Sequence, residues 1–252
     1  MYSYLESILS KYPVITLNDM KEVKLMNRTD TKFITTCSVL MNILWQARND
    51  YMVQNVNCCL NSSYSTTYYD TDDCSMFMDH HNGKSTRHKI RIRSYIGSNL
   101  MFLEIKSKNN KGRTDKKRIE IDCPGITSNY EKDFIAANSP YPPLMLRKRL
   151  VNRFNRITLV NIEKTERVTI DTNIQFYNSC TEKECKLNNL VIIELKRDSE
   201  CYSSVMKILN DNRVHPSGFS KYCIGSAITN PDLKQNRFKM KLHYINKLLT
   251  QI

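Results

Sequence analysis

The sequence predicts an α+β fold, an antiparallel β-barrel of about eight strands with flanking helices. Segments with strand-like alternation follow one another along the chain, and helical patterns fall between groups of them. A doubly wound parallel sheet would instead place a helix after each strand. The 252 residues are enough to bury a large core, and we expect a single domain over residues 1–252.

The expected helices are segments in which apolar residues recur at helical spacing. They span residues 3–11, 38–49, 129–138, 200–211 and 236–250. In the second of them, Leu40, Ile43, Leu44 and Ala47 form one apolar stripe. The third is expected to end before Pro140, because proline cannot extend a helix.

The expected strands are rich in β-branched and aromatic residues or alternate between apolar and polar positions. They span residues 21–35, 64–70, 87–97, 100–108, 115–122, 150–160, 166–171 and 190–197. The second strand ends at Asp70, followed by Asp72 and Asp73, which is a turn signal. A short helix or turn is expected next, and then a loop around Gly83.

Several of these strands combine an apolar face with a face of concentrated charge. Side chains alternate along a strand, so Lys89, Arg91 and Arg93 share one face and Ile90 and Ile92 share the other. A face with so much positive charge repels itself unless an anion lies against it. The pattern therefore indicates a binding surface for an anion.

The same pattern recurs in the other strands. Its further basic residues are Arg28, Lys32, Lys106, Lys116, Arg118, Arg156, Arg167 and Lys196. For any one strand, a solvated sheet face is the ordinary alternative. A barrel with an aqueous interior explains the whole set better, with the apolar faces packed outward against helices.

The composition narrows the class of partner. The chain has 38 Lys and Arg against 25 Asp and Glu, a formal net charge of +13, which favours a nucleic acid, an anionic membrane or a phosphate compound. No apolar run approaches the roughly 18–20 residues of a membrane span, and the N-terminus lacks the order of a signal peptide. The chain shows no nucleic-acid-binding motif, so we disfavour that partner.

The nine cysteines include no Cys-x-x-Cys pair, and their number is odd. They are expected to be reduced thiols in a cytoplasmic protein. The sequence indicates no particular oligomeric state.

Arginine and lysine on one face suit phosphate oxygens, since arginine grips them in pairs and lysine supplies a compact charge. Two strands also carry a glutamate two residues before a lysine, namely Glu104 and Glu194. These are the expected metal ligands. Mg²⁺ or Mn²⁺ would bridge Glu194 and the phosphate oxygens.

A series of ordered motifs resembles a known family. The motifs are Arg28-Thr-Asp-Thr-Lys32, Tyr68-Tyr-Asp-Thr-Asp72, Lys89-Ile-Arg91-Ile-Arg93-Ser-Tyr95, Glu104-Ile-Lys106, Asn155-Arg156, Arg167-Val-Thr-Ile-Asp171, Glu194-Leu-Lys196 and Phe219-Ser220-Lys221-Tyr222. Together they resemble the polyphosphate polymerase (vacuolar transporter chaperone, VTC) domain of the triphosphate tunnel metalloenzyme superfamily, which is related to the CYTH proteins. The resemblance runs from about residue 20 to about residue 230.

The resemblance implies an eight-stranded tunnel whose basic lumen holds a triphosphate or a polyphosphate. It also implies metal-dependent transfer of the terminal phosphate of ATP or another nucleoside triphosphate to a polyphosphate chain. The implied catalytic residues are Lys32, Arg91, Arg93 and Lys221. The other tunnel cations would bind phosphate, and Glu194 would bind the metal.

Two positions depart from related patterns. The superfamily begins its first strand with Glu-x-Glu-x-Lys, whereas this chain has Arg28-x-Asp30-x-Lys32, as is typical of the polymerase branch. Gly218 stands where eukaryotic polymerases carry a second lysine. Two alternatives therefore stay open, a tunnel-fold triphosphatase that hydrolyses triphosphate or polyphosphate, and a non-catalytic polyphosphate-binding protein. We expect a stand-alone form, as in many bacteria.

Overall fold

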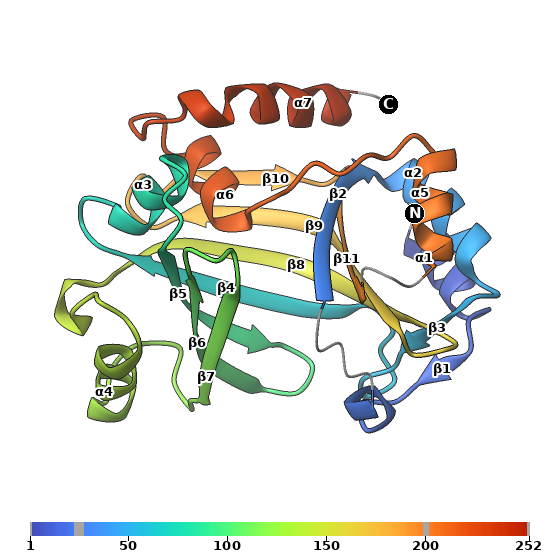
Figure 1. Ribbon diagram of the computed structural model, residues 1–252, viewed down its shortest axis with the longest axis horizontal. Helices are drawn as coiled ribbons and strands as arrows, with labels where there is room; N and C mark the ends of the chain where they lie inside the picture. The colour runs from blue at the N-terminus through green and yellow to red at the C-terminus, as the bar shows by residue number, and fades with distance from the viewer. Residues whose placement is uncertain (1, 23–27, 199–201, 251–252) are drawn as a thin grey trace.

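The computed structural model describes residues 2–22, 28–198 and 202–250. It combines helices with a large antiparallel sheet, which confirms the predicted α+β class (Figure 1). The strands are β1 Val14–Ile15, β2 Arg28–Thr36, β3 Tyr51–Gln54, β4 Ser62–Asp70, β5 Arg87–Tyr95, β6 Leu100–Lys108, β7 Thr114–Glu120, β8 Arg147–Asn161, β9 Glu166–Asn178, β10 Glu184–Leu187 and β11 Leu190–Asp198.

The described helices are α1 Tyr2–Leu9, α2 Cys37–Ala47, α3 Ser75–His81, α4 Asn129–Asn138, α5 Ser204–Asp211, α6 Lys221–Thr229 and α7 Lys239–Thr250. Five of them, α1, α2, α4, α5 and α7, correspond to the five apolar stripes of the sequence. Short 3-10 turns cover Asp19–Glu22, Pro143–Met145 and Asn236–Phe238. None of the described helices is both long and apolar enough to cross a bilayer.

Eight strands form one continuous path in the order β2-β11-β9-β8-β4-β5-β6-β7, and every neighbouring pair is antiparallel. These eight correspond to the strands that the sequence predicts. The first was expected from residue 21, but residues 21–22 lie in a 3-10 turn, and residues 23–27 lie outside the described residues. The short strands β1, β3 and β10 join the sheet beside this path. Their few residues carry too little alternation to be recognised in the sequence.

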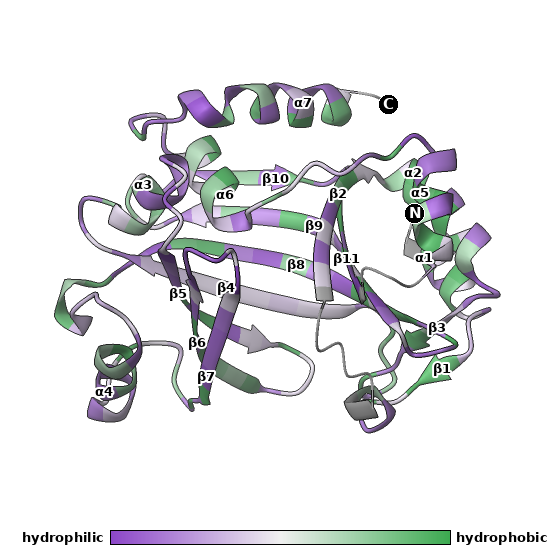
Figure 2. Ribbon diagram, viewed as in Figure 1, coloured by the Kyte–Doolittle hydropathy of each residue, from purple (hydrophilic) through white to green (hydrophobic). Residues whose placement is uncertain are grey.

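The predicted closure of the barrel is not seen within the described residues, because β2 and β7 are the two ends of the path and do not pair. The sequence of β7 explains why it stays an edge. Six of its seven residues are exposed, and Figure 2 draws most of this strand as hydrophilic. Charged side chains of this kind keep an edge strand from pairing further.

The two faces of the sheet pack against different helices. Outward-facing Phe33, Ile157 and Ile193 join a core with α1, α2 and α5. Ile90 and Ile92 lie in a second core beside α3 and α4. These contacts agree with the expectation that the apolar faces pack outward against helices.

The other face also has an apolar part, at one end. There Ile34, Phe154 and Ile192 pack against Tyr222 of α6 and Ile245 of α7. The sequence did not indicate α6 as a helix, because α6 is buried on most sides and lacks a polar stripe. The charged part of this face lies beside it and carries the candidate site.

Candidate functional site

The predicted cations do share one face of the sheet, which we call the basic face. It comprises Lys32 of β2, Lys89, Arg91 and Arg93 of β5, Lys106 of β6, Lys116 and Arg118 of β7, Arg156 of β8, Arg167 of β9 and Lys196 of β11. Paired residues on neighbouring strands project to the same side. Lys89 lies opposite Lys106, and Lys106 lies opposite Lys116.

One predicted site residue cannot be placed. Arg28 begins β2, and its side chain lies outside the part of the chain that the structure describes.

The sheet curls so that its basic face meets itself. The positive charge of Arg91, followed by burial, lowers the pKa of Lys106 to about 6. Glu194 of β11 opposes this shift, and Lys32 of β2 adds to it. Strands β6 and β11 are each second from an end of the path, so only a curled sheet brings these groups within electrostatic range.

Glu104 is fully buried between two cations of the basic face. Its Oε2 accepts from Arg91 Nε at 2.7 Å and lies 2.6 Å from Arg91 Nη2, while Lys116 forms an ion pair with Oε1. Burial raises the pKa of this carboxyl, but Arg91, Arg93 and Lys116 together hold it well below its ordinary value. The carboxylate therefore fixes the orientation of the Arg91 guanidinium.

Asp171 has the same function for Arg156. Nε and Nη2 of Arg156 donate to Oδ1 and Oδ2 of Asp171 at 2.6 and 2.8 Å, and Lys221 donates to Oδ2. Burial raises the pKa of Asp171, but Arg156 and then Lys221 lower it to about 2. Asp171 is not among the site residues expected from the sequence. Asp171 lies four residues after Arg167 in the same strand, so the alternation of side chains already places both on one face.

Glu194 is more accessible than Glu104 and Asp171, the two carboxylates described above. Its side chain is 21% exposed, and it pairs with Lys196 and, at 3.6 Å, with Lys32. Burial raises its pKa, but Lys32 and Lys196 hold it well below the ordinary value. An ionised, partly open carboxylate fits one ligand position of a hard divalent cation.

A metal would need further ligands there. Among the described residues, no three His, Cys, Asp or Glu side chains gather as a metal site. The remaining oxygens would therefore have to come from a bound ligand.

Arg93 and Lys106 are among the cations of the basic face that form no ion pair with a carboxylate in the described part of the chain. Arg93 is 8% exposed, and its Nε donates to Thr66 Oγ1 at 3.4 Å. Lys106 is half-buried and forms neither a hydrogen bond nor an ion pair there. A buried guanidinium without a carboxylate partner, such as that of Arg93, is costly, so an anion bound at this face would be strongly favoured.

Aromatic rings also line the basic face, although none of them was expected from the sequence as a site residue. The Arg156 guanidinium lies 5.4 Å from the Tyr64 ring centroid, and Lys221 Nζ lies 3.1 Å from that of Phe154. Arg118 lies 4.5 Å over Phe102. Ring faces attract cations and hold these side chains in place.

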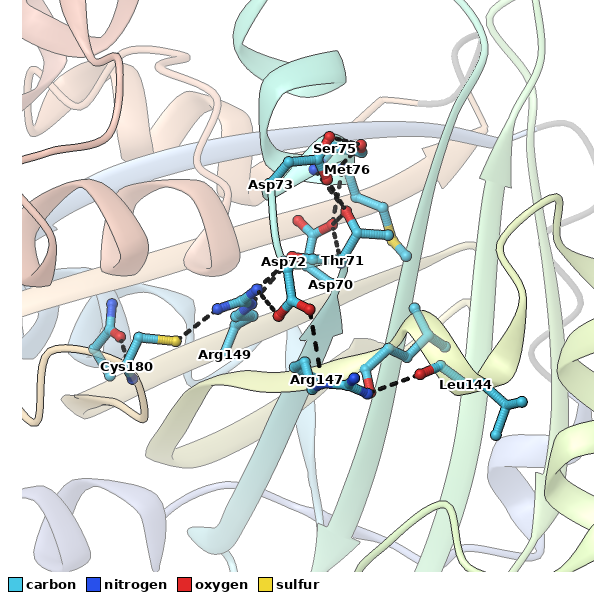
Figure 3. A network of polar contacts seen from close by, with 12 residues as sticks. Asp70, Thr71, Asp72, Asp73, Ser75, Met76, Leu144, Arg147, Arg149 and Cys180 are labelled. Atoms are coloured by element: carbon cyan, nitrogen blue, oxygen red, sulfur yellow. Dashed lines mark hydrogen bonds and ion pairs between the residues drawn. The ribbon is translucent and has the colours of Figure 1, made fainter.

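The acidic residues at the end of β4 have a structural function instead (Figure 3). Asp70 is fully buried, and its carboxylate accepts from the backbone N–H groups of Met76 and Phe77 at 2.9 Å in the first turn of α3. Arg149 Nη2 donates to Asp72 Oδ1 at 2.8 Å. These contacts organise a turn away from the basic face.

Comparison with known proteins identifies the family to which this chain belongs. A family model described as "VTC domain" matches residues 27–230, which include every residue of the basic face as well as Lys221. No curated protein matches the chain.

Solved structures also resemble this chain, among them one from Hippeastrum and one from Vibrio parahaemolyticus. HpAC1 from Hippeastrum, an adenylyl cyclase candidate described as having a dominant triphosphatase activity, is 15% identical with a TM-score of 0.52, covering 81% of this chain and 97% of that one. An adenylate cyclase candidate from Vibrio parahaemolyticus is 9% identical with a TM-score of 0.46, covering 80% of this chain and 99% of that one. The first likeness shows a shared fold.

Proposed function

This chain belongs to the VTC domain family, and we propose that its basic face transfers the terminal phosphate of ATP, or of another nucleoside triphosphate, to a polyphosphate chain. The observation that carries the proposal is Arg93, a buried guanidinium without a carboxylate partner in the described residues, on the same face as the half-buried Lys106, which also lacks one. Linked phosphates supply the dense negative charge that such a face lacks.

The arginines would hold the triphosphate. Arg91 and Arg156 are already oriented by Glu104 and Asp171, so little side-chain entropy is lost when they bind phosphate oxygens. Arg93 and Arg167 would bind beside them. A guanidinium contacts two oxygens of one phosphate, which fixes its orientation as well as its position.

The transfer step needs positioning and neutralised charge more than a protein nucleophile. A terminal oxygen of the acceptor chain attacks the γ-phosphorus and forms the new P–O bond. The bond from the γ-phosphorus to the β–γ bridging oxygen breaks, and the electron pair leaves with the nucleoside diphosphate. Lys32 and Lys221 would stabilise the charge that develops in transit.

A divalent cation, Mg²⁺ or Mn²⁺, would neutralise phosphate charge when bound. Glu194 fits it as the protein ligand, with phosphate oxygens filling the other positions. Glu104, the second metal ligand expected from the sequence, is occupied by Arg91 and Lys116. We therefore assign Glu104 to positioning Arg91.

We further propose that residues 1–252 act as one domain in the cytoplasm. The cysteines within the described ranges are all free thiols, which suits a reducing compartment.

The direct test is to incubate the purified protein with ATP and Mn²⁺ or Mg²⁺ and to separate the products on a gel that resolves polyphosphate lengths. Growth of a phosphate ladder, together with release of the diphosphate, is the expected result. Release of inorganic phosphate without a ladder would identify a triphosphatase. Retention of polyphosphate without turnover would identify a non-catalytic binder.

A further inference from the structure

Three lysines from three separate elements converge on the loop that leads into α6. Lys241 Nζ of α7 donates to the Gly218 carbonyl at 2.5 Å. Lys32 Nζ of β2 donates to the Phe219 carbonyl at 3.2 Å, and Lys89 Nζ of β5 donates to Ser220 Oγ at 3.1 Å. We call Lys32, Lys89 and Lys241 the lysine clamp. Its first two members also belong to the basic face.

Gly218 suits the backbone of this loop. Its φ of +52° is a left-handed conformation that favours glycine. A Cβ atom at this position would lie 3.8 Å from Lys241 Nζ, in ordinary van der Waals contact.

The lysine clamp concentrates positive charge, and of its three members only Lys32 pairs with a carboxylate in the described residues, that of Glu194 at 3.6 Å. Lys241 forms no ion pair with a carboxylate in the described residues, and burial together with Lys32 lowers its pKa. Burial lowers the pKa of Lys89 to about 8. His80 lies nearby, and burial followed by the charges of Lys89 and its neighbours lowers its pKa to about 3, so it stays neutral.

The packing of α7 positions Lys241 beside the loop that leads into α6. Ile245 and Leu248 are buried in the core that α7 shares with α6, so the helix is anchored one turn after Lys241. Helix α7 lies entirely beyond the matched family region, which ends at residue 230. Figure 1 shows α7 along the top of the view, above α6 and β10.

We propose that Lys241 is a further phosphate-contacting residue, which extends the basic face at its α6 end. This inference rests on the proposed function, because the ligand is the doubly charged terminal phosphate of a bound chain. That group belongs either to an inorganic polyphosphate or to a nucleoside triphosphate. In the bound state its oxygens replace the Gly218 carbonyl as the acceptor for the ammonium group.

The test is calorimetric titration of the wild-type protein and of Lys241→Gln, once with tripolyphosphate and once with ATP. Lys247→Gln is the matched control, because it removes the same charge from an exposed position on the same helix. Loss of one charge-assisted hydrogen bond should weaken binding about tenfold in at least one titration. A loss of affinity for tripolyphosphate alone assigns the site to the end of a polyphosphate chain. A loss of affinity for ATP assigns it to the terminal phosphate of the nucleotide.

Two further measurements separate contact from folding. Lys241→Arg keeps the charge and should keep most of the affinity, and in Lys241→Gln the affinity should depend less steeply on salt. Equal affinities for Lys241→Gln and Lys247→Gln with both ligands would overturn this inference alone. Failure of the wild-type protein to bind either ligand would overturn the proposed function as well.

Discussion

Asp171 holds Arg156 through two parallel hydrogen bonds, from Nε to Oδ1 at 2.6 Å and from Nη2 to Oδ2 at 2.8 Å. The same carboxylate pairs with Lys221, the first residue of α6. One side chain therefore fixes an arginine of the basic face and attaches α6 to the sheet.

Replacing Asp171 by Asn should lower the free energy of unfolding by about 3–5 kcal/mol, because it leaves two buried cations without their partner. Urea denaturation followed by circular dichroism measures the change. Asp232→Asn is the control, since that residue is exposed in a turn. A loss below about 1 kcal/mol would show that Asp171 is not the structural anchor inferred from these contacts.

Arg93→Ala should weaken tripolyphosphate binding about a hundredfold, because it removes a charge-assisted pair of phosphate contacts. The protein should stay folded, since Arg93 has no carboxylate partner in the described residues whose charge would be left behind. Calorimetry and the thermal midpoint together check both statements. The control is Arg153→Ala, an exposed arginine of β8, and equal affinities for the two variants would contradict the assignment.

Glu194→Gln should abolish metal-dependent transfer while leaving polyphosphate binding intact or tighter. The substitution removes the proposed metal ligand, and it also removes a negative charge from a face that binds an anion. Gel analysis of the product and calorimetry of binding give the two readouts. Glu6→Gln on α1 serves as the control. Undiminished ladder formation by Glu194→Gln would exclude a role for this carboxylate in metal binding.

Binding should be coupled to protonation of Lys106. The pKa of this lysine in the free protein is about 6, and a bound phosphate would raise it. Polyphosphate should therefore bind more tightly as the pH falls from 8 towards 6, and calorimetry in two buffers with different ionisation enthalpies should detect proton uptake. Lys106→Arg stays charged over this range. It should lose that uptake, and an unchanged value would refute the coupling.

Local pattern predicted much of this molecule. The bounds of β6 and α4 agree with the sequence prediction residue for residue. Alternation in β5 assigned Arg91 and Arg93 to one face and Ile90 and Ile92 to the core, and the structure confirms both. Such features follow from spacing within a single segment, since side-chain direction repeats every two residues in a strand.

The sequence by itself therefore determined which cations line up along each strand and which apolar residues oppose them. The tertiary structure alone decided that Asp171 orients Arg156, that Glu104 is enclosed by Arg91 and Lys116, and that Lys241 reaches Gly218. It also decided that β2 and β7, the two ends of the described sheet path, do not pair with each other. These contacts join residues far apart in the chain, so they depend on strand register and helix packing, which no local spacing specifies.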